Sequence, residues 1–249
     1  MPVPNPVAFT IFNTPIMWYG IIVTLGIVVG AIICCYRAPK HNLTSDRLLD
    51  FIIICVPSAI VGARLYYIIF NWSIYQGNIW SMINIRHGGL AIHGGLIAGF
   101  GVALFLCYKW KVKPLNIMDL AAPSVAIGQA IGRWGNYFNS EAHGGPTNLP
   151  WAVTVDGATY HPTFLYESIW CFILFIVLLQ IDKHRKFQGQ TICLYGALYS
   201  VERFFVEALR TDSLMIGPLK QAQVISLIIF IVCLGMYIYL AKKNRTSRL

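Results

Sequence analysis

Four arginines of this 249-residue sequence lie inside or at the ends of long apolar segments: Arg64, Arg133, Arg203 and Arg210. Charge is costly in such surroundings, so these side chains usually face other helices, find partners and mark a functional site. The plainer interpretation is a buried ion pair or a side chain that reaches the membrane surface. Because guanidinium groups bind phosphate through two parallel hydrogen bonds, the set predicts a phosphate site.

One stretch, LYGALYSVERFFVEALR, carries four polar residues at helical spacing, Tyr199, Arg203, Glu207 and Arg210. Residues three and four apart share one helix face. Glu207 is therefore expected to pair with both arginines and hold their guanidinium groups in place. Glu202 points about 100° away from this face. We expect Glu202 to pair elsewhere, with Arg64.

The segments that position these residues are long and apolar. The sequence is 57% hydrophobic and 12% charged, whereas soluble domains are about 25% charged. A helix needs about 20 apolar residues to cross a bilayer. Seven segments qualify, at 17–36, 48–70, 89–108, 118–134, 164–181, 191–209 and 222–241. The sequence predicts an all-α integral membrane protein, with 1–249 forming a single transmembrane domain.

The fourth segment, 118–134, is the least apolar and is rich in small residues. Ser124, Gly128 and Gly132 recur every four residues and so share one helix face. Small residues at this spacing let a second helix approach closely. We expect a buried central helix here.

Basic residues outside the segments give the orientation. Most lie in loops 37–47, 109–113 and 182–190 and in the C-terminal tail, while the alternate loops hold Arg86 and Lys220. This asymmetry places the first set in the cytoplasm. Seven crossings then put the N-terminus outside and the C-terminus inside. Residues 135–163 become a small extracellular cap, in which alternation at 151–155 predicts a short hairpin.

With this topology the polar groups of five segments share one depth, near the outer face: the four arginines, His93 and Tyr19. Scattered structural ion pairs would not be expected to share a depth. A phosphate site at headgroup depth in an apolar bundle suggests a phospholipid ligand. A tightly bound structural lipid is the plainer alternative.

Several motifs resemble those of one family. GRWGNYFNSEAHG, at 132–144, resembles the signature of prolipoprotein diacylglyceryl transferases. WYG at 18–20, HGGLIAG at 93–99, HPTFLYE at 161–167 and RFFVEALR at 203–210 are similar to the other motifs of that family, in the same order. The resemblance implies a bacterial plasma (inner) membrane enzyme with seven transmembrane helices and an active site on the outer side. It would move the diacylglyceryl group of phosphatidylglycerol onto the lipobox cysteine of a prolipoprotein signal peptide. Glycerol phosphate would be released.

The resemblance also implies which residues act. The signature residues are Arg133, Asn136, Glu141 and Gly144, the late motif supplies Arg203, Glu207 and Arg210, and the remaining functional positions are His93, Tyr19 and Tyr199. His87, in the earlier HGGL, has no counterpart that can be placed, so His93 is favoured. We expect His93, Arg133, Arg203 and Glu207 to be catalytic. The others, with Arg64, are expected to bind substrate.

The chemistry of such a transfer fits these residue types. A thiol attacks a glycerol carbon and a phosphate monoester leaves, so Arg133 and Arg203 can meet the developing charge. The thiolate is the nucleophile, and His93 is the candidate base. Alternatively, an arginine lowers the pKa of the thiol and water takes the proton. Glu141 and Asn136 are expected to fix Arg133 and the lipid glycerol. No metal, nucleotide or redox cofactor is required.

Three other functions compete with this interpretation. A membrane lipid transporter would also hold arginines, but a path through the midplane or paired broken helices would be expected. An intramembrane protease would show a Gly-x-Ser-x-Gly motif or paired membrane aspartates, and the sequence has neither. A non-catalytic phospholipid-binding subunit remains open, and turnover separates it from a transferase. The seven cysteines are interpreted as small buried apolar residues rather than metal ligands.

Overall fold

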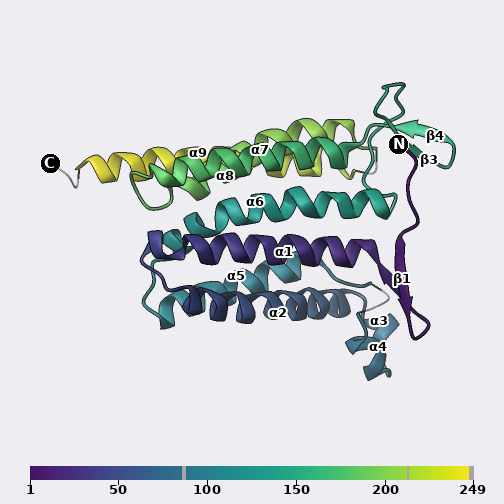
Figure 1. Cartoon of the computed structure of the whole chain (residues 1–249), viewed down its shortest axis with the longest axis horizontal. Coiled ribbons are helices and arrows are strands. Elements are labelled where there is room, and N and C mark those ends of the chain that lie inside the picture. The colour runs from purple at the N-terminus through teal and green to yellow at the C-terminus, as the bar shows by residue number, and fades with distance from the viewer. Residues whose placement is uncertain (86–87, 212, 247–249) are drawn as a thin grey trace. The chain divides into compact units, whose positions relative to one another are not determined.

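The computed structural model describes residues 1–85, 88–211 and 213–246, and these are mostly helical. Seven long helices run through them: α1 Trp18–Arg37, α2 Ser45–Phe70, α5 Ile92–Lys109, α6 Pro114–Phe138, α7 Thr163–Lys183, α8 Gln190–Leu209 and α9 Gln221–Thr246 (Figure 1). Each corresponds to one predicted segment. The helix α6 continues four residues beyond the predicted end at 134, into the region expected to be a cap.

Five of these helices are long and apolar enough to cross a membrane: α1, α2, α5, α7 and α9. The chain is thus a helical protein with membrane-spanning character, as predicted. The helices α6 and α8 fall outside this group because they carry charged and amide side chains, including Arg133 and Arg203. That these two also cross, and that the N-terminus lies outside, stay predictions.

Short elements join the helices. The hairpin β3 Val153–Val155 with β4 Ala158–Tyr160 confirms the hairpin expected near 151–155. Two further hairpins were not predicted, β1 Val7–Ile11 with β2 Thr14–Met17 and β5 Met215–Ile216 with β6 Leu219–Lys220. The short helices η1 Ala38–His41, α3 Trp72–Tyr75 and α4 Ile79–Ile83 lie in loops.

The chain divides into two compact units, residues 1–34 with 118–249, and residues 35–117. The single domain expected over 1–249 is not tested by this division and stays a prediction. In the first unit α1 packs closely on α6. A Cβ built on Gly26 would lie 2.8 Å from the carbonyl oxygen of Gly128, and one on Gly30 would lie 2.9 Å from that of Ser124. The small-residue face predicted for 118–134 is therefore a close helix contact at Ser124 and Gly128.

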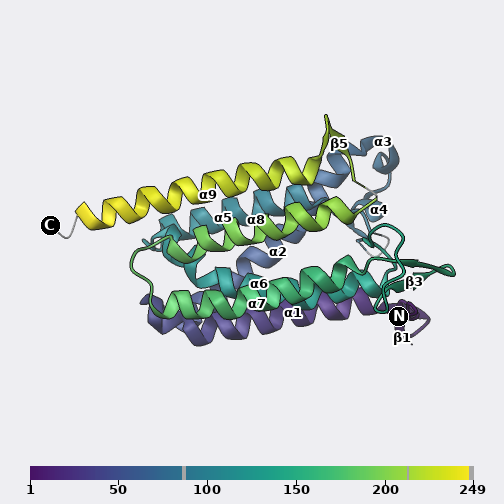
Figure 2. The ribbon, with the colours of Figure 1, turned by 90° about the horizontal axis from the view of Figure 1, so that it is seen from above.

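The helices α7, α8 and α9 complete the first unit, and α8 lies beside α9 in both views (Figures 1 and 2). Asp119 of α6, fully buried, accepts hydrogen bonds from the backbone N–H groups of Gly189 (2.6 Å) and Ile192 (2.9 Å), and from Arg185 (3.0 Å). Asp119 thus caps the start of α8. Arg133 lies 14 residues beyond Asp119, about 21 Å along α6. Arg203 lies a similar distance along α8, so this cap helps bring the two arginines to the same level.

The second unit is built on α2 and α5, which pack along each other. A Cβ on Gly94 would lie 2.3 Å from the carbonyl oxygen of Gly62, so the two backbones touch. The HGGL motif that contains His93 therefore includes a residue required for close helix packing.

Candidate active site

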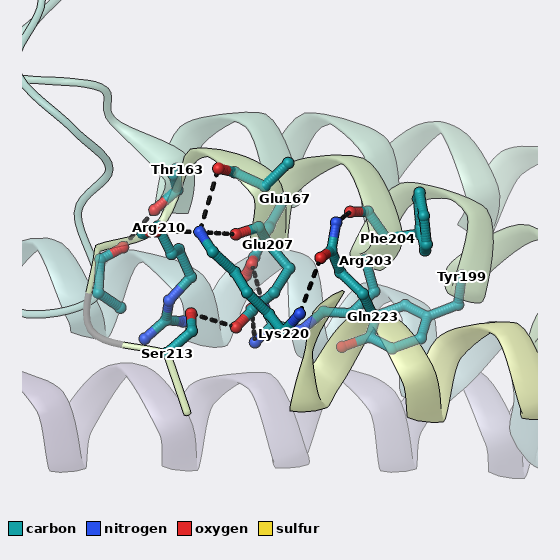
Figure 3. A network of polar contacts seen from close by, with 12 residues as sticks. Thr163, Glu167, Tyr199, Arg203, Phe204, Glu207, Arg210, Ser213, Lys220 and Gln223 are labelled. Carbon is teal, nitrogen blue, oxygen red and sulfur yellow. Dashed lines mark hydrogen bonds and ion pairs between the residues drawn. The ribbon is translucent and has the colours of Figure 1, made fainter. Parts of the chain in front are cut away.

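The centre of the site is a carboxylate shared by two arginines. Glu167 of α7 accepts a hydrogen bond from Arg203 Nη1 of α8 through Oε1 at 2.6 Å (Figure 3). Its Oε2 forms an ion pair with Nε of Arg133 of α6. The side chain of Glu167 is only 2% exposed, whereas those of the two arginines are each 20% exposed. The arginines are thus held from their buried side and keep an accessible side.

Glu167 was not among the predicted site residues. It ends the HPTFLYE motif and lies in the second turn of α7. A carboxylate in so apolar a helix signals a buried partner, since unpaired buried charge is strongly unfavourable. That signal was present in the sequence, but the partner could not be chosen from spacing, because α6, α7 and α8 are distant in the chain.

The predicted polar face of α8 forms at Tyr199, Arg203 and Glu207, whereas Arg210 lies just beyond the end of the helix in extended backbone. Arg203 pairs with Glu207 one turn later, Nη2 to Oε2, at 2.7 Å. Ser213 donates a hydrogen bond to the other oxygen of Glu207 (Figure 3). Tyr199, one turn before Arg203, accepts a hydrogen bond from Arg133 at 3.1 Å. The face therefore reaches Arg133 at one end and fixes Arg203 at its middle.

The signature loop after α6 holds its own polar cluster. The carboxylate of Glu141 accepts hydrogen bonds from Asn136 (3.1 Å) and Asn139 (3.3 Å). The expectation that Glu141 and Asn136 fix Arg133 was wrong, because Arg133 is anchored by Glu167 and Tyr199. Glu141 is exposed, so its cluster presents a carboxylate at the surface of the site.

Gly144 lies where the signature loop meets α7 and α8. Its N–H donates to the carbonyl of His161 (2.8 Å), and the next N–H, of Gly145, donates to that of Leu209 (2.8 Å). A Cβ on Gly144 would lie 2.7 Å from Cβ of His161 and 3.0 Å from the Leu209 oxygen. The structure thus gives Gly144 a close-packing role. Arg210 pairs with it as a backbone bridge.

Tyr19, in the first turn of α1, packs on the last turn of α6. A Cβ on Gly135 would lie 2.9 Å from Cδ2 of Tyr19, so the aromatic ring rests on a bare backbone. The side chain of Tyr19 remains exposed. It belongs to the same unit as the arginine pair.

Arg64, expected to bind substrate and to pair with Glu202, has different partners. Its five N–H groups donate to five backbone carbonyls of the loop that follows α2, those of Ser81, Met82, Asn84, Gly88 and Gly89, at 2.6 to 2.9 Å. The guanidinium also lies 4.9 Å from the ring centre of Tyr75. Neither oxygen of Glu202 accepts a hydrogen bond from any described residue. The predicted Arg64–Glu202 pair is therefore wrong, since the donors of Arg64 are already used.

His93 lies at the start of α5 in the second unit, exposed, with its ring 6.2 Å from that of Tyr66. Its expected role as a base stays a prediction. His87 lies outside the described residues. The glycines that follow it, Gly88 and Gly89, supply two of the carbonyls that hold Arg64, so the first HGGL has a structural part.

An apolar cavity of about 530 Å³ lies between α1, α6 and α7. Trp134 and Ser168, the residues next to Arg133 and Glu167 in the chain, line it together with Ile131, Ile169 and Phe172. Its lining is suited to hydrocarbon rather than to a polar substrate. The first unit thus combines two partly exposed guanidinium groups with an apolar cavity.

Comparison with known proteins gives one consistent result. A family model described as prolipoprotein diacylglyceryl transferase matches residues 6–239. The chain is 50% identical over 242 residues to the phosphatidylglycerol–prolipoprotein diacylglyceryl transferase of Clostridioides difficile, covering 97% of each. It is 50% identical over 226 residues to the protein of that name from Finegoldia magna (90% and 91% covered), and 45% identical over 253 residues to that from Clostridium novyi (98% of each).

Proposed function

The chain belongs to the prolipoprotein diacylglyceryl transferase family, and we propose that it moves the diacylglyceryl group of phosphatidylglycerol to the thiol of a lipobox cysteine. The products are a thioether-linked lipid and glycerol phosphate. The observation that carries this proposal is the shared carboxylate of Glu167, which places Arg133 and Arg203 beside each other.

In the proposed reaction Arg133 and Arg203 bind the phosphodiester of the lipid. The sulfur of the substrate attacks the glycerol carbon, the carbon–oxygen bond breaks, and its electron pair leaves with the phosphate. Charge on that oxygen rises along the reaction, and fixed guanidinium groups stabilise it most strongly there. The hydroxyl of Tyr199, which already accepts from Arg133, keeps its own O–H to donate to a phosphate oxygen.

The proton of the thiol is transferred to a base or to water. His93 is the proposed base because a neutral imidazole can accept a proton at one ring nitrogen. An arginine that lowers the pKa of the thiol, with water as the acceptor, is the alternative. Both routes give a thiolate, the reactive form of cysteine.

The remaining site residues are proposed to contact the lipid and the peptide. Glu141, held by Asn136, accepts a glycerol hydroxyl, and Tyr19 contacts the headgroup from α1. One acyl chain occupies the cavity beside Trp134. Arg210 and Gly144 shape the peptide side of the site, where the signature loop meets the end of α8. For Arg64, five backbone acceptors favour a structural role over the substrate contact predicted from the sequence.

The proposed setting is a bacterial plasma membrane, with 1–249 as one domain. All seven long helices cross it, the N-terminus and residues 135–163 lie outside, and the site opens at the outer face. The distribution of Lys and Arg between alternate loops supports this orientation. The polar side chains of α6 and α8 pair with α7 rather than face lipid, which allows both helices to cross.

The experiment is a transfer assay followed by mass spectrometry. Purified protein receives phosphatidylglycerol and a lipobox peptide, or a matched peptide with Ser in place of Cys. A diacylglyceryl mass gain on the Cys peptide alone, with release of glycerol phosphate, supports the proposal. Folded, lipid-bound protein without turnover would contradict it and favour a lipid-binding subunit or transporter.

A further inference from the structure

Lys220 lies in a loop assigned to the outer side, and its side chain is partly buried and forms hydrogen bonds to the protein. It ends β6, and its ammonium donates hydrogen bonds to three carbonyls at the end of α8: those of Glu207 (2.9 Å), Ala208 (3.1 Å) and Arg210 (Figure 3). The last carbonyls of a helix have no partner within the helix, and a cation there is favourable.

The one carbonyl of this turn that Lys220 does not bind also accepts a hydrogen bond. Leu209 accepts from the N–H of Gly145, in the signature loop, at 2.8 Å. All four carbonyls from 207 to 210 therefore have donors. An ammonium has three N–H groups, and Lys220 has three carbonyl partners. Its donors are thus committed to the helix end rather than available to a phosphate.

This end of α8 joins two parts of the site. Glu207, whose carbonyl Lys220 binds, holds Arg203 through its side chain. The same turn receives Gly145 of the signature loop. Gln223 fixes the position of Lys220, since it accepts from the backbone N–H of Lys220 (3.1 Å) and donates to the carbonyl of Phe204 (3.2 Å).

We propose that Lys220 is a positioning residue of the transferase. By capping α8 it holds the turn that carries Glu207, and through Glu207 the guanidinium of Arg203. It also keeps that turn in the conformation in which the Leu209 carbonyl accepts a hydrogen bond from Gly145 of the signature loop. This inference rests on the proposed phosphate site, because its effect on catalysis passes through Arg203.

The test compares Lys220→Met, which removes the donors, with Lys220→Arg, which retains a cation that can donate to several carbonyls. Because small displacements of catalytic groups are costly, kcat should fall about tenfold or more in Lys220→Met. Lys220→Arg should recover activity to within about threefold. Hydrogen exchange at the Gly145 amide should accelerate only in Lys220→Met. Lys243→Met, at the exposed end of α9, is the control and should match wild type.

Wild-type kcat in Lys220→Met would overturn the inference, as would lost activity with unchanged exchange at Gly145. If Lys220→Met does not yield folded protein, Lys220→Gln replaces it. This variant keeps two N–H groups without charge and should still lose about tenfold; wild-type activity in it would overturn the inference. Arg203→Ala is assayed alongside. An active Arg203→Ala contradicts the proposed phosphate site, whereas an inactive Arg203→Ala with fully active Lys220→Met contradicts the role of Lys220 alone.

Discussion

Arg133 and Arg203, from helices that are not adjacent in sequence, are held by opposite oxygens of the single carboxylate of Glu167. Without that carboxylate the two positively charged guanidinium groups would repel each other. The buried carboxylate allows them to stay together while their exposed sides can bind an anion.

Glu167→Gln should lose at least about a hundredfold in activity, because it leaves two partly buried cations without their shared partner, a change that costs about 3–5 kcal/mol when a buried pair is broken. Initial rates in the peptide transfer assay measure the effect. Glu141→Gln is the matched comparison, since the Glu141 carboxylate is exposed; its loss should be the smaller. Equal losses in the two variants would count against Glu167 as the organiser of the site.

Arg133→Lys and Arg203→Lys should each lose about ten- to a hundredfold, because an ammonium cannot pair with a carboxylate and bind phosphate through two parallel hydrogen bonds at once. The loss should be seen in kcat/KM for phosphatidylglycerol. Arg245→Lys, on the exposed last turn of α9, provides a control expected to be unaffected. Full activity in either site variant would mean that charge alone is sufficient.

Glu202→Gln should retain activity and stability, in contrast to Glu207→Gln. Both carboxylates are buried, but Glu202 accepts no hydrogen bond from the described residues, whereas Glu207 binds Arg203 and Ser213. Removing a buried charge that lacks a hydrogen-bonded partner should be neutral or favourable. The midpoint of thermal unfolding and the transfer rate, measured for both variants, test this prediction. A large loss in Glu202→Gln would show that its charge is used.

Gly144→Ala should abolish most activity, while Gly132→Ala should be tolerated. A methyl group on Gly144 would collide with Cβ of His161 at 2.7 Å, but one on Gly132 would meet no described atom within 4 Å. Overpacking of this kind costs about 1–3 kcal/mol. Both glycines belong to the signature motif. Comparing the activities of the two variants therefore shows whether a loss comes from the steric clash or from changing any signature glycine. An inactive Gly132→Ala would indicate contact with substrate there.

Arg64→Lys should destabilise the loop after α2 rather than the chemistry. It loses hydrogen bonds from a charged group to backbone carbonyls, each worth about 1.5–3 kcal/mol. Limited proteolysis between residues 71 and 91 should accelerate, while KM for phosphatidylglycerol should stay within about twofold at a temperature where the protein is folded. A raised KM without faster proteolysis would instead support the substrate contact predicted from the sequence.

Hydropathy and helical spacing were sufficient to predict the seven long helices and the polar face of α8 from Tyr199 to Glu207, because both are properties of contiguous sequence. The small-residue face of α6 was also recognisable, and Gly128 does contact α1. These features follow from local periodicity.

Partners between distant helices could not be predicted in this way. Glu202 was expected to pair with Arg64 because it points away from the polar face of α8, yet Arg64 binds backbone carbonyls, which no side-chain pattern reveals. Glu141 was assigned to Arg133 because both belong to one motif. The actual anchor, Glu167, comes from another motif, and only the packing of α7 against α6 and α8 brings it there.

The most direct measurement is lipid binding by native mass spectrometry, comparing wild type with the Arg133→Lys, Arg203→Lys double variant. Each lipid-depleted protein is offered phosphatidylglycerol and diacylglycerol, which has the same chains without the phosphate. The proposed site predicts that wild type prefers phosphatidylglycerol and that the double variant loses this preference while binding diacylglycerol as before. Unchanged preference for phosphatidylglycerol in the double variant would contradict the phosphate site.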